Sequence, residues 1–248
     1  MSTELVPSIA QMGSLAAVDS DNEIASAFAE GIAGQERHEP PGIPIIRIDH
    51  KTARFLLNGE PVESVAGFPV QWFQSRAYWE GKFKPGEHAP PTCVSNDGIV
   101  PLPGEGRQAD NCYSCKWSQW GSAPLGDGQA CKVQTFLFLL NPEFGETPIG
   151  CLIAPPSSIR AIVGTGRQPG YLQRAKQFRD PATGKQAKYH ELVWTRFALE
   201  RAGDTHCILV PTPVSVAKDA DEARAIAGVR GAMLRQMEEL RGSVAQED

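Results

Sequence analysis

Short apolar runs bounded by turn-forming residues dominate the chain from residue 43 onward. Most of them alternate apolar and polar side chains or form a brief apolar block, which is typical of β-strands. The Asn58-Gly59 pair predicts a tight turn within one of these runs. Leu192 and Trp194 fit strand alternation, whereas Phe197 breaks it. Strands are predicted over 43–49, 53–64, 68–83, 132–140, 148–156, 189–202 and 206–216.

Helical periodicity is confined to fewer segments. Residues 21–34 predict a short helix, and residues 157–178 predict two helical pieces separated by a Gly/Pro break at 164–170. Residues 219–242 carry apolar side chains three to four positions apart, which predicts a longer helix capped by Asp219.

Together these elements predict an α+β, mainly β fold. We expect an OB-like barrel or a small antiparallel sheet, with a four-cysteine metal-binding loop insertion and a C-terminal helix. Residues 1–20 predict a disordered tail, and residues 21–240 predict a single β-rich domain. Within that domain, residues 85–132 are rich in Gly and Pro and form the predicted insertion, while residues 241–248 form an acidic tail.

The composition is that of a globular protein, with 41% hydrophobic and 21% charged residues. No run approaches the roughly 18 apolar residues that a membrane span needs, so no membrane partner is expected. The first residues lack a basic start and a continuous apolar block, so no secretory leader is predicted. The expected location is the cytoplasm, where closely spaced cysteines indicate metal binding more than disulfides.

The net charge of −5 is unevenly distributed. Residues 1–42 hold seven acidic residues and one basic residue. Residues 156–202 hold nine basic residues against three acidic ones, a local charge of +6. Such asymmetry marks a polyanion-binding face or, equally, a solvated surface balanced by acidic ends.

Four cysteines within 39 positions form the most specific chemical pattern in the sequence. Cys93 is followed after eighteen residues by Cys112, after two more by Cys115, and after fifteen more by Cys131. Four thiolates around one Zn2+ ion make a closed tetrahedral structural site, and a metal would organise a segment that cannot build its own core.

Three other interpretations of these cysteines stay open. They are ordinary buried cysteines, ligands of a [4Fe-4S] cluster, or, for the CxxC pair, a redox couple. Zinc is favoured because the segment is too polar to bury unliganded thiols and no helix clearly follows Cys112. Cys151 and Cys207 lie in apolar strands and are expected to be core residues.

No catalytic motif is apparent. The chain lacks a nucleophile elbow, a phosphate loop, a zinc-protease helix and a dinucleotide-binding glycine pattern. A closed four-cysteine site also leaves no open coordination position for an activated water. A non-enzymatic role is therefore expected.

Aromatic and basic residues interleave before and inside the cysteine segment, as proteins that bind single-stranded nucleic acid require. Bases would stack on the rings, and phosphates would contact the cations. The candidate contacts are Trp72, Arg76, Tyr78, Trp79, Lys82, Lys84, Lys116, Trp117, Trp120, Arg160, Arg167, Arg174, Lys176 and Lys188.

The segments PPTCVSNDG, CYSCKWSQWGS and GDGQACK, followed at once by VQTFLFLL, resemble a group of phage and mobile-element proteins. These share a Cys…CxxC…WGS…GxxC segment that leads into a strand, and some look like single-stranded DNA-binding proteins of replication modules. The resemblance covers residues 90 to about 140. It departs from the group's usual lysine-rich form at the lysine-free GDGQAC, which removes an expected phosphate contact.

The resemblance implies single-stranded DNA binding in phage or mobile-element replication or recombination, inside a bacterial host cell. Replication or recombination proteins would bind the acidic ends. Two other functional hypotheses remain: a metal-stabilised protein-interaction or structural adaptor, and an iron–sulfur nucleic-acid enzyme or its accessory subunit.

Overall fold

The computed structural model describes residues 43–80, 91–124, 128–145, 148–164, 168–202 and 206–244, with side chains up to Arg235 in the last helix. It divides into two compact units. The sheet unit comprises the chain up to Trp72 and from Leu137 onward, and the cysteine unit comprises Phe73–Phe136. The predicted tail at 1–20, the predicted helix at 21–34 and the last residues of the predicted acidic tail lie outside the described residues.

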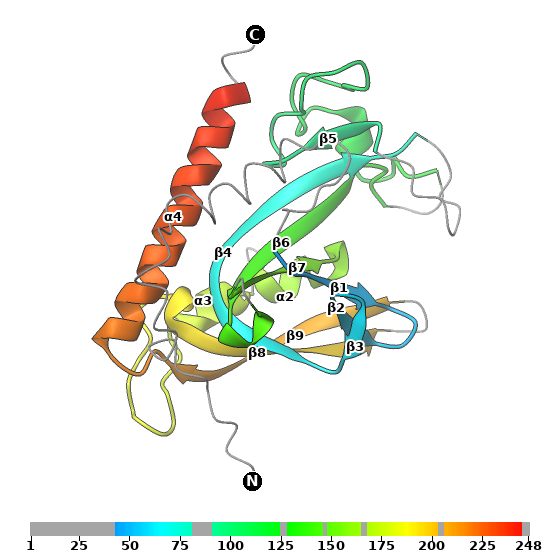
Figure 1. Ribbon diagram of the computed structural model, residues 1–248. Helices are drawn as coiled ribbons and strands as arrows, with labels where there is room; N and C mark the ends of the chain where they lie inside the picture. Colours follow the sequence, from blue (N-terminus) through cyan, green and yellow to red (C-terminus); the bar gives the residue numbers. More distant parts are fainter. Residues whose placement is uncertain are drawn as a thin grey trace. The chain divides into compact units, whose positions relative to one another are not determined.

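The described elements are mainly strands, as predicted (Figure 1). Their order in the sheet is β3-β2-β1-β7-β6-β4-β8-β9, and β5 pairs with β4 outside this path. The strands are β1 Ile45–Asp49, β2 Arg54–Leu57, β3 Glu60–Val62, β4 Val65–Tyr78, β5 Cys93–Ser95, β6 Lys132–Leu140, β7 Ile149–Ala154, β8 Val193–Ala202 and β9 His206–Val216.

The fold class α+β, mainly β, is confirmed, but the narrower topology predictions are not. An OB fold is a five-stranded Greek-key barrel, whereas the described sheet has nine strands. The sheet is also not purely antiparallel, because β1 and β7 pair in parallel through Ile45↔Cys151 and Ile46↔Leu152. Among the described residues, no helix is both long enough and apolar enough to cross a membrane.

The turn predicted at Asn58-Gly59 is confirmed. It joins β2 to β3, which pair in antiparallel fashion from Leu57↔Glu60. Both turn residues have positive φ, +52° at Asn58 and +89° at Gly59. Asn and Gly tolerate this backbone geometry better than other residues, and it matches the twist of the flanking strands.

Strand β8 faces the core with its odd-numbered positions, and Phe197 is one of them. The predicted strand at 189–202 begins instead with a 3₁₀ turn, His190–Leu192, and β8 follows it. The pairing of β8 with β9 shifts register between Trp194 and Thr195. The shift skips Val214 of β9, so it leaves the alternation of β8 unchanged. Val193, Thr195 and Phe197 share the buried face, whereas Trp194 is buried on the other face, where its ring packs edge-on against Phe68.

The helices match their predicted positions closely. They are α2 Ile159–Ile162, α3 Tyr171–Ala175 and α4 Ala220–Val244. The Asp219 carboxylate accepts hydrogen bonds from the backbone N–H groups of Asp221 and Glu222, at 3.0 and 2.9 Å, so the predicted cap is confirmed.

The main cluster of buried hydrophobic side chains, as described, lies in the sheet unit. Buried side chains from its strands meet those of α2 and α3, for example Phe55, Leu152, Ile162 and Phe197. The predicted core cysteines, Cys151 and Cys207, are fully buried. The core cluster as described contains no member from Phe73–Phe136, so hydrophobic burial stabilises the sheet unit more than the cysteine unit.

Candidate metal centre and exposed aromatic turn

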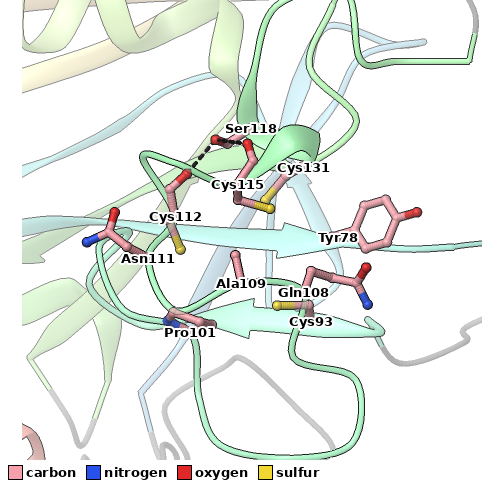
Figure 2. Close-up of a pocket in the computed structure, with 10 residues that line it drawn as sticks. All are labelled: Tyr78, Cys93, Pro101, Gln108, Ala109, Asn111, Cys112, Cys115, Ser118 and Cys131. Atoms are coloured by element: carbon pink, nitrogen blue, oxygen red, sulfur yellow. Dashed lines mark hydrogen bonds between the residues drawn. The ribbon is translucent and has the colours of Figure 1, made fainter.

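The four predicted cysteines line one pocket in the cysteine unit (Figure 2). Cys93 opens β5 and lies opposite Tyr78 of β4. Cys112 and Cys115 lie in the turn before the 3₁₀ segment Lys116–Ser118, and Cys131 directly precedes β6. Residues up to 38 positions apart in the sequence are thus brought around a single space.

Backbone hydrogen bonds hold this arrangement. The Cys112 N–H donates to the Ile99 carbonyl and the Cys131 N–H donates to the Trp117 carbonyl, each at 2.8 Å. The buried Ser118 hydroxyl bonds to the carbonyls of Cys115, at 2.8 Å, and Cys112. The Ser118 side chain therefore ties both ends of the CxxC turn together.

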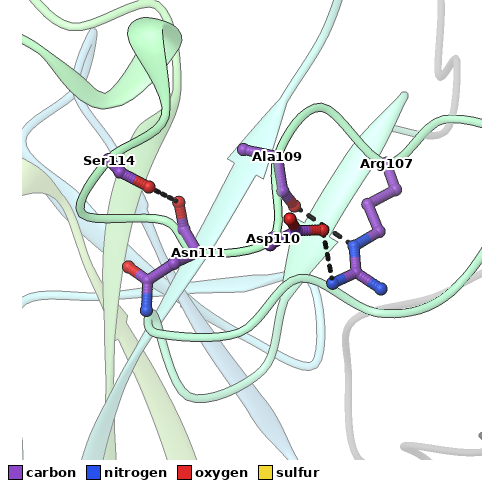
Figure 3. A network of polar contacts seen from close by, with 5 residues as sticks. All are labelled: Arg107, Ala109, Asp110, Asn111 and Ser114. Carbon is purple, nitrogen blue, oxygen red and sulfur yellow. Dashed lines mark hydrogen bonds and ion pairs between the residues drawn. The ribbon is translucent and has the colours of Figure 1, made fainter.

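A polar network fixes the segment that leads into this turn (Figure 3). The Arg107 guanidinium donates to the Ala109 carbonyl and to the Asp110 carboxylate, each at 3.2 Å. The Asn111 side-chain oxygen accepts from the Tyr113 N–H at 2.7 Å, which makes an Asx turn. Local hydrogen bonds alone therefore hold the CxxC turn in this shape.

Cys112, Cys115 and Cys131 are buried, Cys93 is half-buried, and the four thiols are close enough to affect one another. Burial, with a smaller contribution from the nearby Cys112, Cys115 and Cys93, raises the pKa of Cys131 to about 11. Burial also raises the pKa of Cys112. The positive charge of Arg76 opposes both shifts and lowers the two pKa values.

Arg76 was predicted as a nucleic-acid contact, but it lies beside the cysteines. It pairs with Ser95 across β4 and β5. Its Nη1 atom is buried and has no hydrogen-bond partner among the described residues. A buried guanidinium nitrogen without a partner is unfavourable unless a nearby negative charge compensates it.

The four thiols that line this pocket are suitable metal ligands, but their positions do not match the geometry of a metal site. Within the described ranges, no group of three or more His, Cys, Asp or Glu side chains has the geometry of a metal site. The four thiols thus share a pocket without forming a coordination shell. The pocket volume is about 10 Å³, roughly the space that one water-sized sphere needs.

Three of the predicted stacking rings are engaged inside the protein. Trp72 is half-buried and packs against the core of the sheet unit. Tyr78 is buried and stacks on Trp117, with ring centroids 4.9 Å apart and planes at 15°. The Trp117 Nε1–H donates to Gln108 at 3.0 Å, and Lys116 Nζ lies 4.6 Å from the centroid of the Trp117 ring.

Other rings of the cysteine unit face solvent. Trp120 is 78% exposed, and Trp79 is 38% exposed. Tyr113, in the middle of the CxxC turn, is 66% exposed, and sequence reasoning missed it. Its position between two candidate ligands was an available clue, because side chains between the cysteines of a closed site cannot enter the site themselves.

The predicted cations divide between the two units. Lys116 is exposed in the cysteine unit. Arg160, Arg174, Lys176 and Lys188 are exposed in the sheet unit. Lys82, Lys84 and Arg167 lie outside the described residues.

Two acidic residues within the basic segment 156–202 are turned away from solvent. Asp180 is buried, and its carboxylate accepts hydrogen bonds from the N–H groups of Ala182, Thr183 and Val216. Glu191 lies 3.4 Å from His190 Nδ1 and 3.5 Å from Arg230 Nε. The third acidic residue, Glu200, is exposed. The surface of this segment is therefore more basic than its sequence alone implies.

Comparison with known proteins adds no relative. No protein-family model matches this chain, and neither does a curated protein or a solved structure.

Proposed function

We propose that this protein binds single-stranded nucleic acid, most specifically single-stranded DNA, in a non-catalytic role. The observation that carries the proposal is the basic segment 156–202, in which the described cations are exposed while Asp180 and Glu191 have partners within the protein. Exposed cations attract phosphates, and the counterions condensed on the nucleic acid are released when it binds.

A zinc ion held by Cys93, Cys112, Cys115 and Cys131 is part of this proposal. The common pocket, the shared burial and the adjacent Arg76 support it. A [4Fe-4S] cluster held by the same four cysteines is the alternative cofactor. The metal would be structural, because four thiolates complete its coordination.

The biological setting is proposed from the phage-type resemblance of the cysteine segment. The protein would act in replication or recombination of a phage or mobile element, in the cytoplasm of a bacterial host. The acidic ends of the chain, which hold few cations, would contact partner proteins rather than DNA.

The first experiment measures binding of a fluorescent oligo-dT strand across a salt series. We expect log K to fall linearly with log salt, with a slope of about −0.7 per phosphate contacted. The triple variant Arg174→Gln, Lys176→Gln, Lys188→Gln should lower the steepness of that slope by roughly 2. A matched triple, Lys51→Gln, Arg54→Gln, Arg224→Gln, removes exposed cations outside the basic segment and should leave the slope nearly unchanged.

Two results would contradict the proposal. One is the absence of strand binding even at low salt. The other is an equal loss in both triple variants, which would indicate attraction by total charge rather than by the basic segment.

A protein-interaction adaptor is the second candidate function. The exposed Trp120 and Tyr113 rings favour it, because large exposed aromatic side chains also anchor protein interfaces. An adaptor would show no salt-dependent binding of oligo-dT, so the same titration separates the two functions.

A further inference from the structure

We propose that Tyr113 and Trp120 form a preorganised stacking platform for unpaired nucleobases on the outer side of the metal turn. This inference rests on the proposed nucleic-acid function and deepens it. Tyr113 has no role in the site predicted from the sequence.

The two platform rings differ from four other described rings of the cysteine unit, which stack on one another in pairs. Phe73 stacks on Phe136 with centroids 5.0 Å apart, and Tyr78 stacks on Trp117. In each pair, one face of each ring is covered by the other ring. Tyr113 and Trp120 are instead 66% and 78% exposed. Exposing two large rings costs hydration free energy that ligand binding would recover.

The backbone beneath the two rings is held in one arrangement. The Gln119 side-chain amide donates to the Tyr113 carbonyl at 2.8 Å and to the Cys115 carbonyl at 3.3 Å. This bond places the residue next to Trp120 against the residue that carries the Tyr113 ring. The Ser122 hydroxyl donates to the Gln119 carbonyl at 2.6 Å.

Rigid support matters because it lowers the entropy lost on binding. Tyr and Trp have only two side-chain torsions each, so rings on a fixed backbone lose little further freedom when they stack. The platform is thus prepared before the ligand arrives.

The charges around the rings favour a polyanion. Lys116 lies between the two rings in sequence and is exposed. Lys132 is exposed, and its Nζ donates to the Gln129 carbonyl at 2.7 Å, which leaves its charge uncompensated by that contact. The exposed Asp110 is paired with Arg107 at 3.2 Å. Rings flanked by cations match a strand whose bases alternate with phosphates.

The rings select unpaired bases for a geometric reason. In a duplex, both faces of each base are covered by neighbouring base pairs. In a single strand the faces are free to stack on an aromatic side chain, whatever the base. The platform therefore predicts preference for single strands without strong sequence preference.

The test compares three probes of equal length: oligo-dT, a fully abasic strand with the same phosphates, and the duplex of the dT strand. The variants are Tyr113→Ala, Trp120→Ala and the conservative Trp120→Phe. Each alanine variant should bind oligo-dT roughly 5- to 100-fold more weakly, while its abasic-strand affinity stays unchanged. Trp120→Phe keeps a ring and should lose much less. Oligo-dT should also quench tryptophan fluorescence in wild type and not in Trp120→Phe.

Val100→Ala is the matched control, because Val100 is 48% exposed in the same unit but its aliphatic side chain has no ring to stack on a base. It should bind oligo-dT like wild type. Zinc content of each variant checks that the turn is intact.

Each of three results would contradict a different part of the proposal. Alanine variants that bind oligo-dT like wild type would refute the platform and leave the proposed function standing. Equal losses for dT and abasic strands would mean that the rings support the fold and do not stack on bases. No binding of any probe by wild type would refute the proposed function itself.

Discussion

At the scale of single residues, Arg76 has the most consequential placement in the cysteine unit. Its strand pairing puts it opposite Ser95, two positions after Cys93, and one of its nitrogens is buried without a partner. Four zinc-bound thiolates carry two more negative charges than the ion neutralises. A fixed guanidinium beside them would offset part of that excess, and the excess charge would in turn compensate the buried nitrogen.

We predict that Arg76→Met lowers zinc affinity roughly 10- to 100-fold, the range found when groups that support metal ligands are removed. Competition with a chromophoric zinc chelator measures the effect. Arg54→Met is the control, because Arg54 is an exposed arginine of the sheet unit that pairs with Glu63 at 3.9 Å. An affinity equal to that of wild type in Arg76→Met would remove Arg76 from the account of the site.

At the scale of elements, a hairpin at residues 178–187 presents part of the basic segment. It carries Arg179 and Lys185, and its chain reverses at Gly184, where φ is +69°. Asp180 fastens it, because its carboxylate binds the Ala182 and Thr183 N–H groups within the hairpin and the Val216 N–H of β9. A buried carboxylate thus organises a cationic surface.

Asp180→Asn should destabilise the protein by about 1–3 kcal/mol at neutral pH, as expected when hydrogen bonds to a charged acceptor are lost. Burial raises the pKa of Asp180, but the hydrogen bonds from Val216, Ala182 and Thr183 outweigh it, and the net pKa is lowered. A lowered pKa means that the carboxylate contributes its stability above its unfolded pKa of about 3.9 and loses it as the pH falls through the folded value.

The difference in unfolding free energy between wild type and Asp180→Asn should therefore be complete above about pH 5 and shrink below about pH 4. Urea unfolding at several pH values measures it. Glu200→Gln, at an exposed position of β8, serves as the control and should show a much smaller loss. A gap that is constant with pH would mean that the charge of Asp180 is irrelevant to stability.

At the scale of the whole molecule, the two units are stabilised by different means. The sheet unit has a continuous hydrophobic core, whereas the cysteine unit has short strands, two stacked ring pairs and a thiol-lined pocket. A metal that binds only the folded cysteine unit would add its binding free energy to the stability of that unit.

Removal of metal by a chelator should therefore open the cysteine unit and spare the sheet unit. Limited proteolysis should then cut within residues 91–131 while the fragments from the sheet unit persist, and added Zn2+ should restore protection. Cys115→Ala should show the opened pattern even with zinc present. Identical cleavage with and without chelator would indicate that no metal organises the cysteines.

The sequence by itself determined most local features. The Asn58-Gly59 turn, the Asp219 cap and the strands flanking the cysteine segment follow from backbone preferences and from hydrogen bonds between near neighbours in the chain. The cysteine spacing was also sufficient to identify the four thiols that share one pocket. Such features depend on a few adjacent residues, so the sequence pattern is enough to predict them.

Only the tertiary structure decided which side chains remain available for binding. It placed Tyr78 against Trp117, left Tyr113 exposed, buried Asp180 and set Arg76 beside the thiols. It also decided the parallel pairing of β1 with β7 and the burial of Trp194 on the face of β8 opposite to Phe197. These outcomes depend on partners far away in the chain, because burial and electrostatic environment are properties of the packed neighbourhood and not of the local pattern.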